Sequence, residues 1–148
     1  MGLKSRTIWI PGDPVAKGRP RASRRGRGVV MHTPKKTADH ERRIQAIARR
    51  AWNGDAPFDG PLMVEFLPVF GRTQAQEGKR WNPGALWHQK RPDLDNLAKV
   101  IDALNGIAFR DDGQISKIQA SKIRAPRAWR EPGTVITVSQ LPEHTQND

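Results

Sequence analysis

Residues 91–117 read RPDLDNLAKVIDALNGIAFRDDGQISK, a helical pattern that leads into a strand pattern. The apolar residues of the first half recur on one helical face: Leu94, Leu97, Ala98, Ile101 and Leu104. They predict a helix over residues 94–105 with Gly106 just after its last turn, and a strand is expected over residues 115–125. A helix with one apolar face must bury that face, so we expect it to pack on a sheet.

The chain on either side supplies further strands and a second helix. Strand patterns occur at residues 7–10, 29–31, 62–70 and 135–141. A helix is expected over residues 37–52, with Thr37 as its N-cap. This order of elements predicts an α+β fold, a two-layer sandwich of one mixed β-sheet with helices packed on one face.

The remaining segments lack periodicity. Residues 12–28 are expected to form a mobile basic arm, residues 71–90 a polar loop, and residues 142–148 a frayed tail. All of them are short enough to belong to one domain that spans residues 1–148.

The composition is strongly basic and free of cysteine. The 26 Lys and Arg against 15 Asp and Glu give a formal net charge of +11. Such a domain commonly binds a polyanion, most often nucleic acid; a basic surface that binds none, or association with a ribosome or membrane, is the alternative. The lack of cysteine excludes disulfides, zinc–thiolate sites and a thiol nucleophile. No signal-peptide pattern and no run of ~20 apolar residues occurs, so we expect a cytoplasmic protein without a membrane span.

Acidic residues are scarce, and several of them flank the predicted helix. Asp93 lies at its N-cap position, where the helix dipole favours a carboxylate, and Asp95, Lys99 and Asp102 share one polar stripe. The chain that follows the helix could bring Asp111 or Asp112 beside the first two aspartates. Three converging carboxylates repel one another unless a cation neutralises them, and Mg²⁺ prefers oxygen ligands. A lysine one turn away could stabilise charge on a reacting phosphate.

Each of these features also has a purely structural explanation. Asp93 can act only as an N-cap, Asp95 and Lys99 only as a surface pair, and Asp111–Gly113 only as a turn. Their joint occurrence on a basic chain favours a metal site, because carboxylates near a polyanionic ligand weaken its binding unless a cation lies between them.

Several motifs together resemble the RusA family of Holliday-junction resolvases, which is common in phages and prophages. They are RPDLDNLAK at residues 91–99, DALNG at 102–106, DDGQI at 111–115 and the basic opening IPGDPVAKGRPR at 10–21. The resemblance covers most of the chain, and D-x-D-N-x-x-K followed by D-A-L-x-G and a paired acid is far more constrained than D-x-D alone.

The resemblance implies a homodimer that makes paired symmetric nicks across a four-way DNA junction in a bacterial cell. It implies dependence on Mg²⁺, for which Mn²⁺ is a plausible substitute. The implied catalytic residues are Asp93, Asp95, Lys99 and Asp112. Asp93, Asp95 and Asp112 are the implied metal ligands, with Asp111 as an accessory.

The basic arm and the loop tryptophans are the expected DNA contacts. Between Asp13 and Asp39 the chain carries eight Lys and Arg and no acid, which predicts phosphate binding that weakens with salt; a solvated charge run is the alternative. The expected DNA-binding residues are Lys17, Arg19, Arg21, Arg24, Arg25, Arg27, Lys90 and Arg91. Trp81 and Trp87 could wedge into a branch point or anchor the polar loop.

Two other functions remain open on these observations. One is a non-catalytic protein that binds branched DNA. The other is a less selective metal nuclease that acts on flaps or replication forks.

Overall fold

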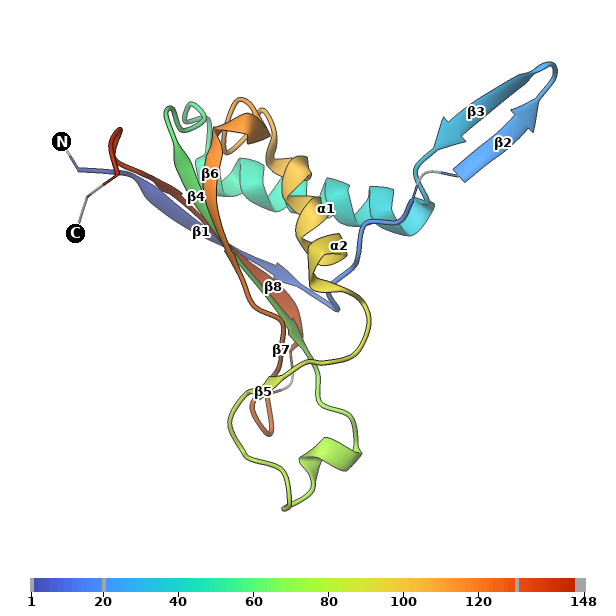
Figure 1. The fold of residues 1–148 in the computed structure, drawn as a ribbon, viewed down its shortest axis with the longest axis vertical. Coiled ribbons are helices and arrows are strands. Elements are labelled where there is room, and N and C mark those ends of the chain that lie inside the picture. The colour runs from blue at the N-terminus through green and yellow to red at the C-terminus, as the bar shows by residue number, and fades with distance from the viewer. Residues whose placement is uncertain (1, 20, 130, 146–148) are drawn as a thin grey trace.

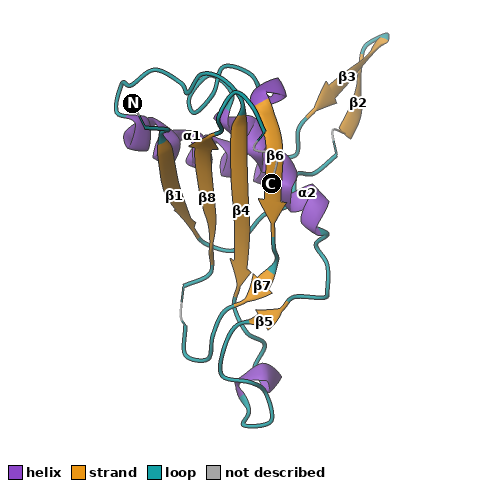
Figure 2. Cartoon of the chain, turned by 60° about the vertical axis from the view of Figure 1, so that its left-hand side comes forward, coloured by secondary structure: helices purple, strands orange, loops and turns teal. Residues whose placement is uncertain are grey.

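The body of the protein is an open mixed β-sheet covered on one face by helices, which confirms the predicted α+β class (Figures 1 and 2). This computed structural model describes residues 2–19, 21–129 and 131–145. Within them, six strands form the main sheet in the order β1-β8-β4-β7-β5, with β6 beside β4. Their bounds are β1 Ser5–Pro11, β4 Leu62–Phe70, β5 Leu86–Trp87, β6 Ile115–Ala120, β7 Ile123–Arg124 and β8 Gly133–Gln140. β8 pairs antiparallel with β1 and β4, whereas β6 and β7 run parallel to β4.

The core lies between the sheet and the helices. Alternate residues of β4 point toward the helices, and Leu62, Val64 and Phe66 are buried. The longer helix, α1 (Lys35–Trp52), covers them with a stripe that includes Ile44 and Trp52. Burial of these faces gives the layered arrangement that the alternation predicts.

The helices differ from the expected ones in two details. α1 begins at Lys35 after Pro34, so Thr37 is not its N-cap. Thr37 is buried instead, and its hydroxyl accepts a hydrogen bond of 2.8 Å from the Gly18 backbone N–H. The predicted helix over 94–105 is a short α-helix, α2 (Leu94–Ala98), continued by a 3₁₀ helix, η2 (Lys99–Leu104), in which four of six residues are buried.

Part of the segment expected to be an irregular arm is a β-hairpin. Strand β2 (Arg21–Arg25) pairs antiparallel with β3 (Gly28–His32) in a two-stranded sheet that projects from the body (Figure 1). Gly26 has a φ of 61° at the first position of the two-residue turn, a conformation that glycine adopts without strain. The sequence identified only the second strand, because Ala22 is the only apolar residue of β2 and no alternation is visible there.

The polar loop of residues 71–90 is tied to the sheet by backbone carbonyl contacts. Arg72 donates to the carbonyls of Gln76 at 2.7 Å and Ala125 at 2.9 Å, and Arg127 donates to that of Trp81 at 2.7 Å. A short 3₁₀ helix, η1 (Ala75–Glu77), and strand β5 lie within the loop. In the described residues, no helix has the length and apolar character needed to cross a membrane.

Candidate active site

The segment Asp93–Lys99 presents its charged side chains at the start of α2, next to β6. Asp93 is the extended residue before the helix, and its carbonyl accepts a hydrogen bond of 3.1 Å from the Leu97 N–H. Asp95 and Lys99 line a shallow hollow of about 560 Å³ with Ile118 and Ala120 of β6. Both charged side chains are exposed. A DNA backbone can therefore reach them from solvent.

Lys122 fixes the chain that leads into this helix. Its ammonium group donates hydrogen bonds to the carbonyl of Lys90 at 2.6 Å and to that of Pro92 at 2.7 Å. The Lys122 carbonyl in turn accepts a bond of 3.1 Å from the His88 N–H. Since Lys122 lies between β6 and β7, these contacts anchor the approach to Asp93 on the sheet.

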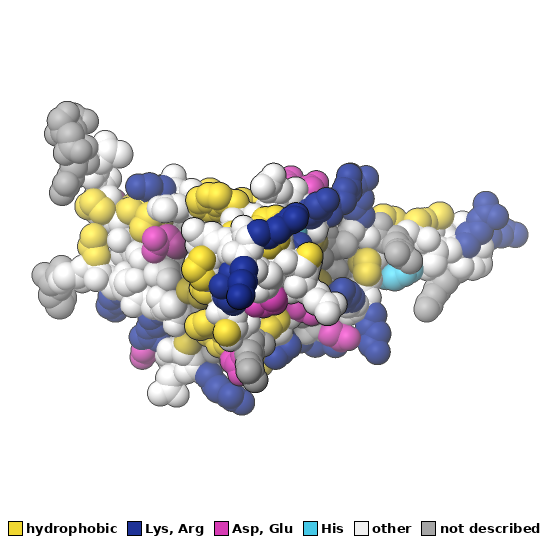
Figure 3. All heavy atoms as spheres, turned by 90° about the horizontal axis from the view of Figure 1, so that it is seen from below, with side chains coloured by type: hydrophobic (Ala, Val, Ile, Leu, Met, Phe, Trp, Pro, Cys, Tyr) yellow, Lys and Arg dark blue, Asp and Glu magenta, His cyan; other side chains and the backbone are white. Residues whose placement is uncertain are grey.

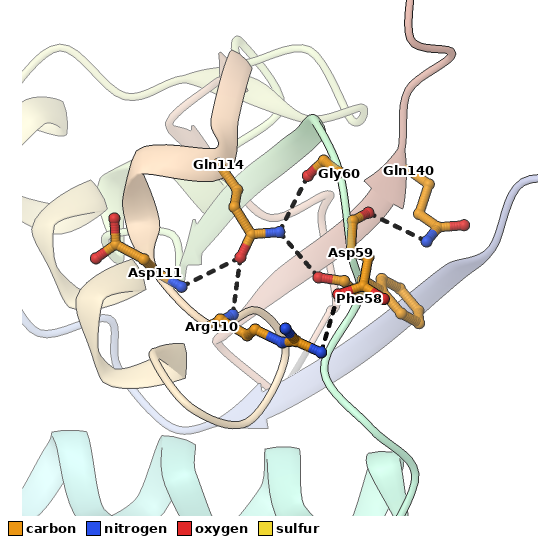
Figure 4. Close-up of polar contacts among 7 residues, drawn as sticks. All are labelled: Phe58, Asp59, Gly60, Arg110, Asp111, Gln114 and Gln140. Carbon is orange, nitrogen blue, oxygen red and sulfur yellow. Dashed lines mark hydrogen bonds and ion pairs between the residues drawn. The ribbon is translucent and has the colours of Figure 1, made fainter.

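Gln114 holds the acidic turn that precedes β6 (Figure 4). Its side-chain oxygen accepts hydrogen bonds from the backbone N–H groups of Arg110 at 2.8 Å and Asp111 at 3.1 Å. Its amide group donates to the carbonyls of Phe58 at 2.9 Å and Gly60 at 3.0 Å. All four bonds fix the start of the short 3₁₀ helix η3 (Asp112–Gln114) against the end of the loop before β4.

Three carboxylates gather where η3 meets η2. Loss of hydration, followed by the charges of Asp102 and Asp111 and hydrogen bonding with both side chains, raises the pKa of the Asp112 carboxyl above its ordinary value. Asp111 caps η3, since its side chain accepts a bond of 3.0 Å from the Gly113 N–H. The structure therefore brings Asp112 together with Asp111 and with Asp102, which belongs to the motif helix.

Lys17 joins the base of the arm to this acidic group. Its ammonium nitrogen lies 3.6 Å from a carboxylate oxygen of Asp102 and 3.4 Å from one of Glu41 on α1. Its backbone N–H donates to the Asn96 carbonyl at 3.1 Å. Asn96 also accepts a bond of 3.0 Å from the Lys99 ammonium group through its side chain. The arm, α1 and the motif helix thus meet around Lys17.

The expected convergence of three metal-binding carboxylates is not formed by the described part of the chain. Within it, no group of three Asp, Glu or His side chains has metal-binding geometry, and Asp93 and Asp95 do not join Asp112 in one such group. The donor chemistry nonetheless suits a hard cation, because the groups near Asp112 are carboxylates that repel one another. Mg²⁺ commonly uses only one or two protein carboxylates together with waters and phosphate oxygens.

The expected DNA-binding residues divide into three kinds. Arg19, Arg24 and Arg27 are exposed on the arm, and Lys90 and Arg91 are exposed just before the motif helix. Lys17 differs from them because it is engaged by two carboxylates. The side chains of Arg21 and Arg25 lie outside what the structure describes. Figure 3 shows Lys and Arg side chains spread over one face of the body, where several acidic groups lie among them, and out to the end of the hairpin.

The two loop tryptophans differ in exposure. Trp87 on β5 is 73% exposed, whereas Trp81 is half-buried. His88 between Trp87 and the motif helix is buried, and its ring meets that of Phe70 edge-on with 4.5 Å between centroids. A packed, buried ring of this kind indicates a structural role for His88.

Sequence reasoning did not assign three residues of this region to the site. Asp102 was placed on the polar stripe of Asp95 and Lys99, but it was not named as a site residue. Gln114 could have been found from the capping-box spacing Asp111-x-x-Gln114. Lys122 gave no signal, because its partners lie 30 and 32 residues earlier in the chain.

Comparison with known proteins gives two matches. The model of the family described as "Endodeoxyribonuclease RusA" matches residues 11–139. A protein of Bacillus subtilis (strain 168) described as "Uncharacterized protein YqaN" is 30% identical over 138 residues, which cover 89% of this chain and 94% of that protein. The matched region includes the arm, the motif helix and the acidic turn.

Proposed function

Because the chain belongs to the RusA family of endodeoxyribonucleases, we propose that it resolves four-way DNA junctions by paired symmetric nicks. It acts as a homodimer and requires Mg²⁺, which Mn²⁺ can replace. Two-fold symmetry lets two identical subunits address opposite strands of a junction in the same way.

One observation above all supports a nuclease rather than a simple DNA binder. A chain with a net charge of +11 keeps Asp102, Asp111 and Asp112 together, and loss of hydration followed by the charges of the other two raises the pKa of the Asp112 carboxyl. Close carboxylates on a basic surface oppose each other and would also repel a DNA backbone. This cost is compensated if a divalent cation occupies the region while the DNA is bound.

The proposed roles follow from residue chemistry. Asp93, Asp95 and Asp112 would hold Mg²⁺, with Asp111 as an accessory. Because these side chains form no metal-binding group in the described residues, they would have to converge around the cation when DNA is bound. A bound Mg²⁺ supplies Lewis acidity toward a phosphate oxygen and lowers the pKa of a bound water. The exposed Lys99 ammonium, oriented by Asn96, stabilises negative charge that develops on the phosphate. Arg19, Arg24, Arg27, Lys90 and Arg91 hold the DNA arms through their phosphates.

A cleavage panel tests this function. A four-way junction, a flap, a replication fork and a linear duplex of matched sequence are incubated with the protein, with and without Mg²⁺. We expect paired nicks in the junction with Mg²⁺ and none without it. Binding of the junction with no cleavage at any Mg²⁺ or Mn²⁺ concentration would show a non-catalytic binder. Equal cleavage of flap, fork and junction would show a less selective nuclease.

Asp95→Asn separates the metal role from DNA binding. We expect cleavage to fall by at least about a hundredfold, since an amide is a poorer ligand for Mg²⁺ than a carboxylate. Junction affinity without metal should stay equal or improve, because one charge that repels phosphate is gone. Gel-shift titration and single-turnover cleavage measure the two quantities. A parallel loss of binding and cleavage would contradict the metal role.

A further inference from the structure

The β2–β3 hairpin has no partner for either face within the described residues. Every residue of β3 is exposed, and β2 and β3 pair only with each other (Figures 1 and 2). A two-stranded hairpin is at best marginally stable in water on its own. A partner that covers one face of the hairpin would therefore stabilise it.

One face of the hairpin is largely apolar. Residues directly opposite each other in an antiparallel pair point to the same side, and the register pairs Ala22 with Met31 and Arg24 with Val29. Val29 is 66% exposed and Met31 is 60% exposed. Val30, paired with Ser23, points to the opposite face. The wedge face, defined here as Ala22, Arg24, Val29 and Met31, thus presents two large apolar side chains beside one arginine.

The positive charge of the hairpin and its flanking residues favours DNA as the partner that covers the wedge face. Residues 19–36 contain seven Lys and Arg and no acid. A second copy of the same hairpin would repel this segment, whereas DNA phosphates attract it. If Arg24 and Arg27 contact phosphates beside the branch, Val29 and Met31 on the same hairpin come close to the DNA bases.

The chemistry of the wedge face favours a branch point over a regular groove. Groove readout relies on hydrogen-bond donors and acceptors at base edges, and neither Val29 nor Met31 supplies them. Apolar side chains inserted by DNA-bending proteins act between base steps, which they partly unstack. Opening a base step costs less where the continuous stack is already interrupted, as it is where the arms meet at the centre of a junction.

The base of the hairpin is tied to the candidate site. Gly18 donates to the Thr37 hydroxyl at 2.8 Å and Lys17 to the Asn96 carbonyl at 3.1 Å. A Cβ at Gly18 would lie 2.9 Å from the Pro34 ring, so the chain passes close to the start of α1 at this point. These contacts give the hairpin a defined starting point beside the motif helix.

We propose that the hairpin inserts Val29 and Met31 as an apolar wedge into the branch point of the DNA junction, while Arg24 and Arg27 bind the flanking phosphates. This inference rests on the proposed junction-resolving function. The wedge opens base pairs at the centre of the junction, and the same hairpin gives the protein its preference for branched over linear DNA.

Fluorescence of 2-aminopurine tests the wedge. The base is placed beside the branch point of a junction, and protein is added with EDTA so that no cleavage occurs. Wild type should raise the fluorescence as the base unstacks. The double variant V29T/M31T keeps β-forming residues, and we expect its fluorescence increase to be at least about fivefold smaller. Its affinity for linear duplex should stay unchanged.

Two control variants separate the wedge from other effects. V30T makes the same kind of change on the opposite face and should behave as wild type. R24Q/R27Q should weaken binding to junction and duplex alike and reduce the slope of log K against log salt by about 2. Circular dichroism and thermal melts of each variant check that the body remains folded.

Failure of the wedge role and failure of the junction-resolving function give different results in these experiments. An unchanged fluorescence increase in V29T/M31T overturns the wedge, even if wild type cleaves junctions. An equal loss in V30T also overturns it, because the effect would not belong to one face. If wild type fails to cleave any junction, the proposed function fails, and the fluorescence assay still reports whether the hairpin opens a branch.

Discussion

Asp112 couples the acidic turn to the motif helix, and its ionisation should limit stability in the absence of metal. Its folded-state pKa is raised by loss of hydration and by Asp102 and Asp111. A raised pKa favours the protonated folded state, so its contribution to stability is full below the unfolded pKa and is lost as pH rises through the folded pKa.

Asp112→Asn should therefore stabilise the metal-free protein at neutral pH. The melting temperature of the variant should exceed that of wild type at pH 7, and the difference should vanish near pH 3, where the wild-type carboxyl is protonated. Thermal melts from pH 3 to 7 in EDTA measure this, with Glu143→Gln as a control for removal of an exposed charge. A variant that is less stable than wild type at pH 7 would contradict the proximity of these carboxylates.

For His88 we expect the stability of the protein to change with pH in the opposite direction. Burial, followed by the charges of Arg124 and Lys122, lowers the pKa of His88 from 6.5 to about 4. The unfolded chain takes up a proton near pH 6.5 and the folded protein does not, so stability present above that pH is lost as pH falls toward 4. Between pH 7 and 5 this should cost about 1–2 kcal/mol.

His88→Asn tests this dependence, since an asparagine oxygen can replace the ring nitrogen Nδ1 that accepts from the Lys90 N–H at 3.3 Å. Urea unfolding at pH 7 and pH 5 should show a smaller loss of stability in the variant than in wild type. His144→Asn, on the exposed chain end, should leave the wild-type dependence intact. Identical pH dependence in H88N and wild type would show that His88 does not titrate in this way.

Among the elements, Lys122 between β6 and β7 fixes the position of α2 relative to the sheet. Lys122→Met removes both bonds to the carbonyls of Lys90 and Pro92, so the approach to Asp93 becomes free to shift. Displacement of catalytic groups by about 1 Å can cost on the order of a hundredfold in rate, and we expect single-turnover cleavage to fall by about 10- to 100-fold.

A comparison of rate and affinity identifies this as a positioning effect. Junction affinity of K122M should change by no more than that of Lys117→Met, which removes the same charge from an exposed position on β6. Lys122→Arg, which retains donors, should recover part of the rate. If K122M and K117M lose affinity and rate to the same extent, Lys122 acts only through its charge.

The elements that sequence predicts well are those with strong periodicity. β4, β8 and α1 each bury an alternating or helical stripe that is visible in the sequence, and the structure confirms them within a few residues. The change from α2 to η2 and the break between β6 and β7 are not visible, because both depend on contacts with distant strands. The prediction of Thr37 as an N-cap was wrong for a related reason. Its hydroxyl accepts a hydrogen bond from the Gly18 N–H, which is distant in the chain, and not from an N–H of its own helix.

The candidate site was predictable where it is local. Asp93, Asp95 and Lys99 follow from one motif on one helix, and η3 follows from a capping pattern. The association of Asp112 with Asp102 was not predictable from spacing, because the angle at which η3 returns toward η2 depends on the four hydrogen bonds of Gln114. The sequence predicts Lys17 as a DNA contact. Its ion pairs with Glu41 and Asp102 depend on the fold and are not visible in the sequence.

Over the whole molecule, much of the exposed positive charge lies on elements other than those that bring Asp102, Asp111 and Asp112 together. The hairpin and the segment before α2 carry exposed Arg and Lys. Asp102, Asp111 and Asp112 lie together where η2 meets η3. Long-range attraction to DNA therefore comes from parts of the molecule that need not contact the reacting phosphate. Paired nicking requires in addition that two such molecules act on one junction, which a subunit-mixing experiment can test.

Mixtures of wild type and D95N measure how many active subunits one resolution event needs. If each subunit of a dimer cuts one strand, a heterodimer nicks a cruciform plasmid once, and only the wild-type homodimer makes it linear. An equal mixture with free exchange contains about one quarter wild-type homodimer by random pairing. Linear product should therefore fall to about a quarter, with nicked circles accumulating in its place. A fall to only about half, without nicked circles, would mean that a single subunit makes both cuts and would contradict the proposed dimer.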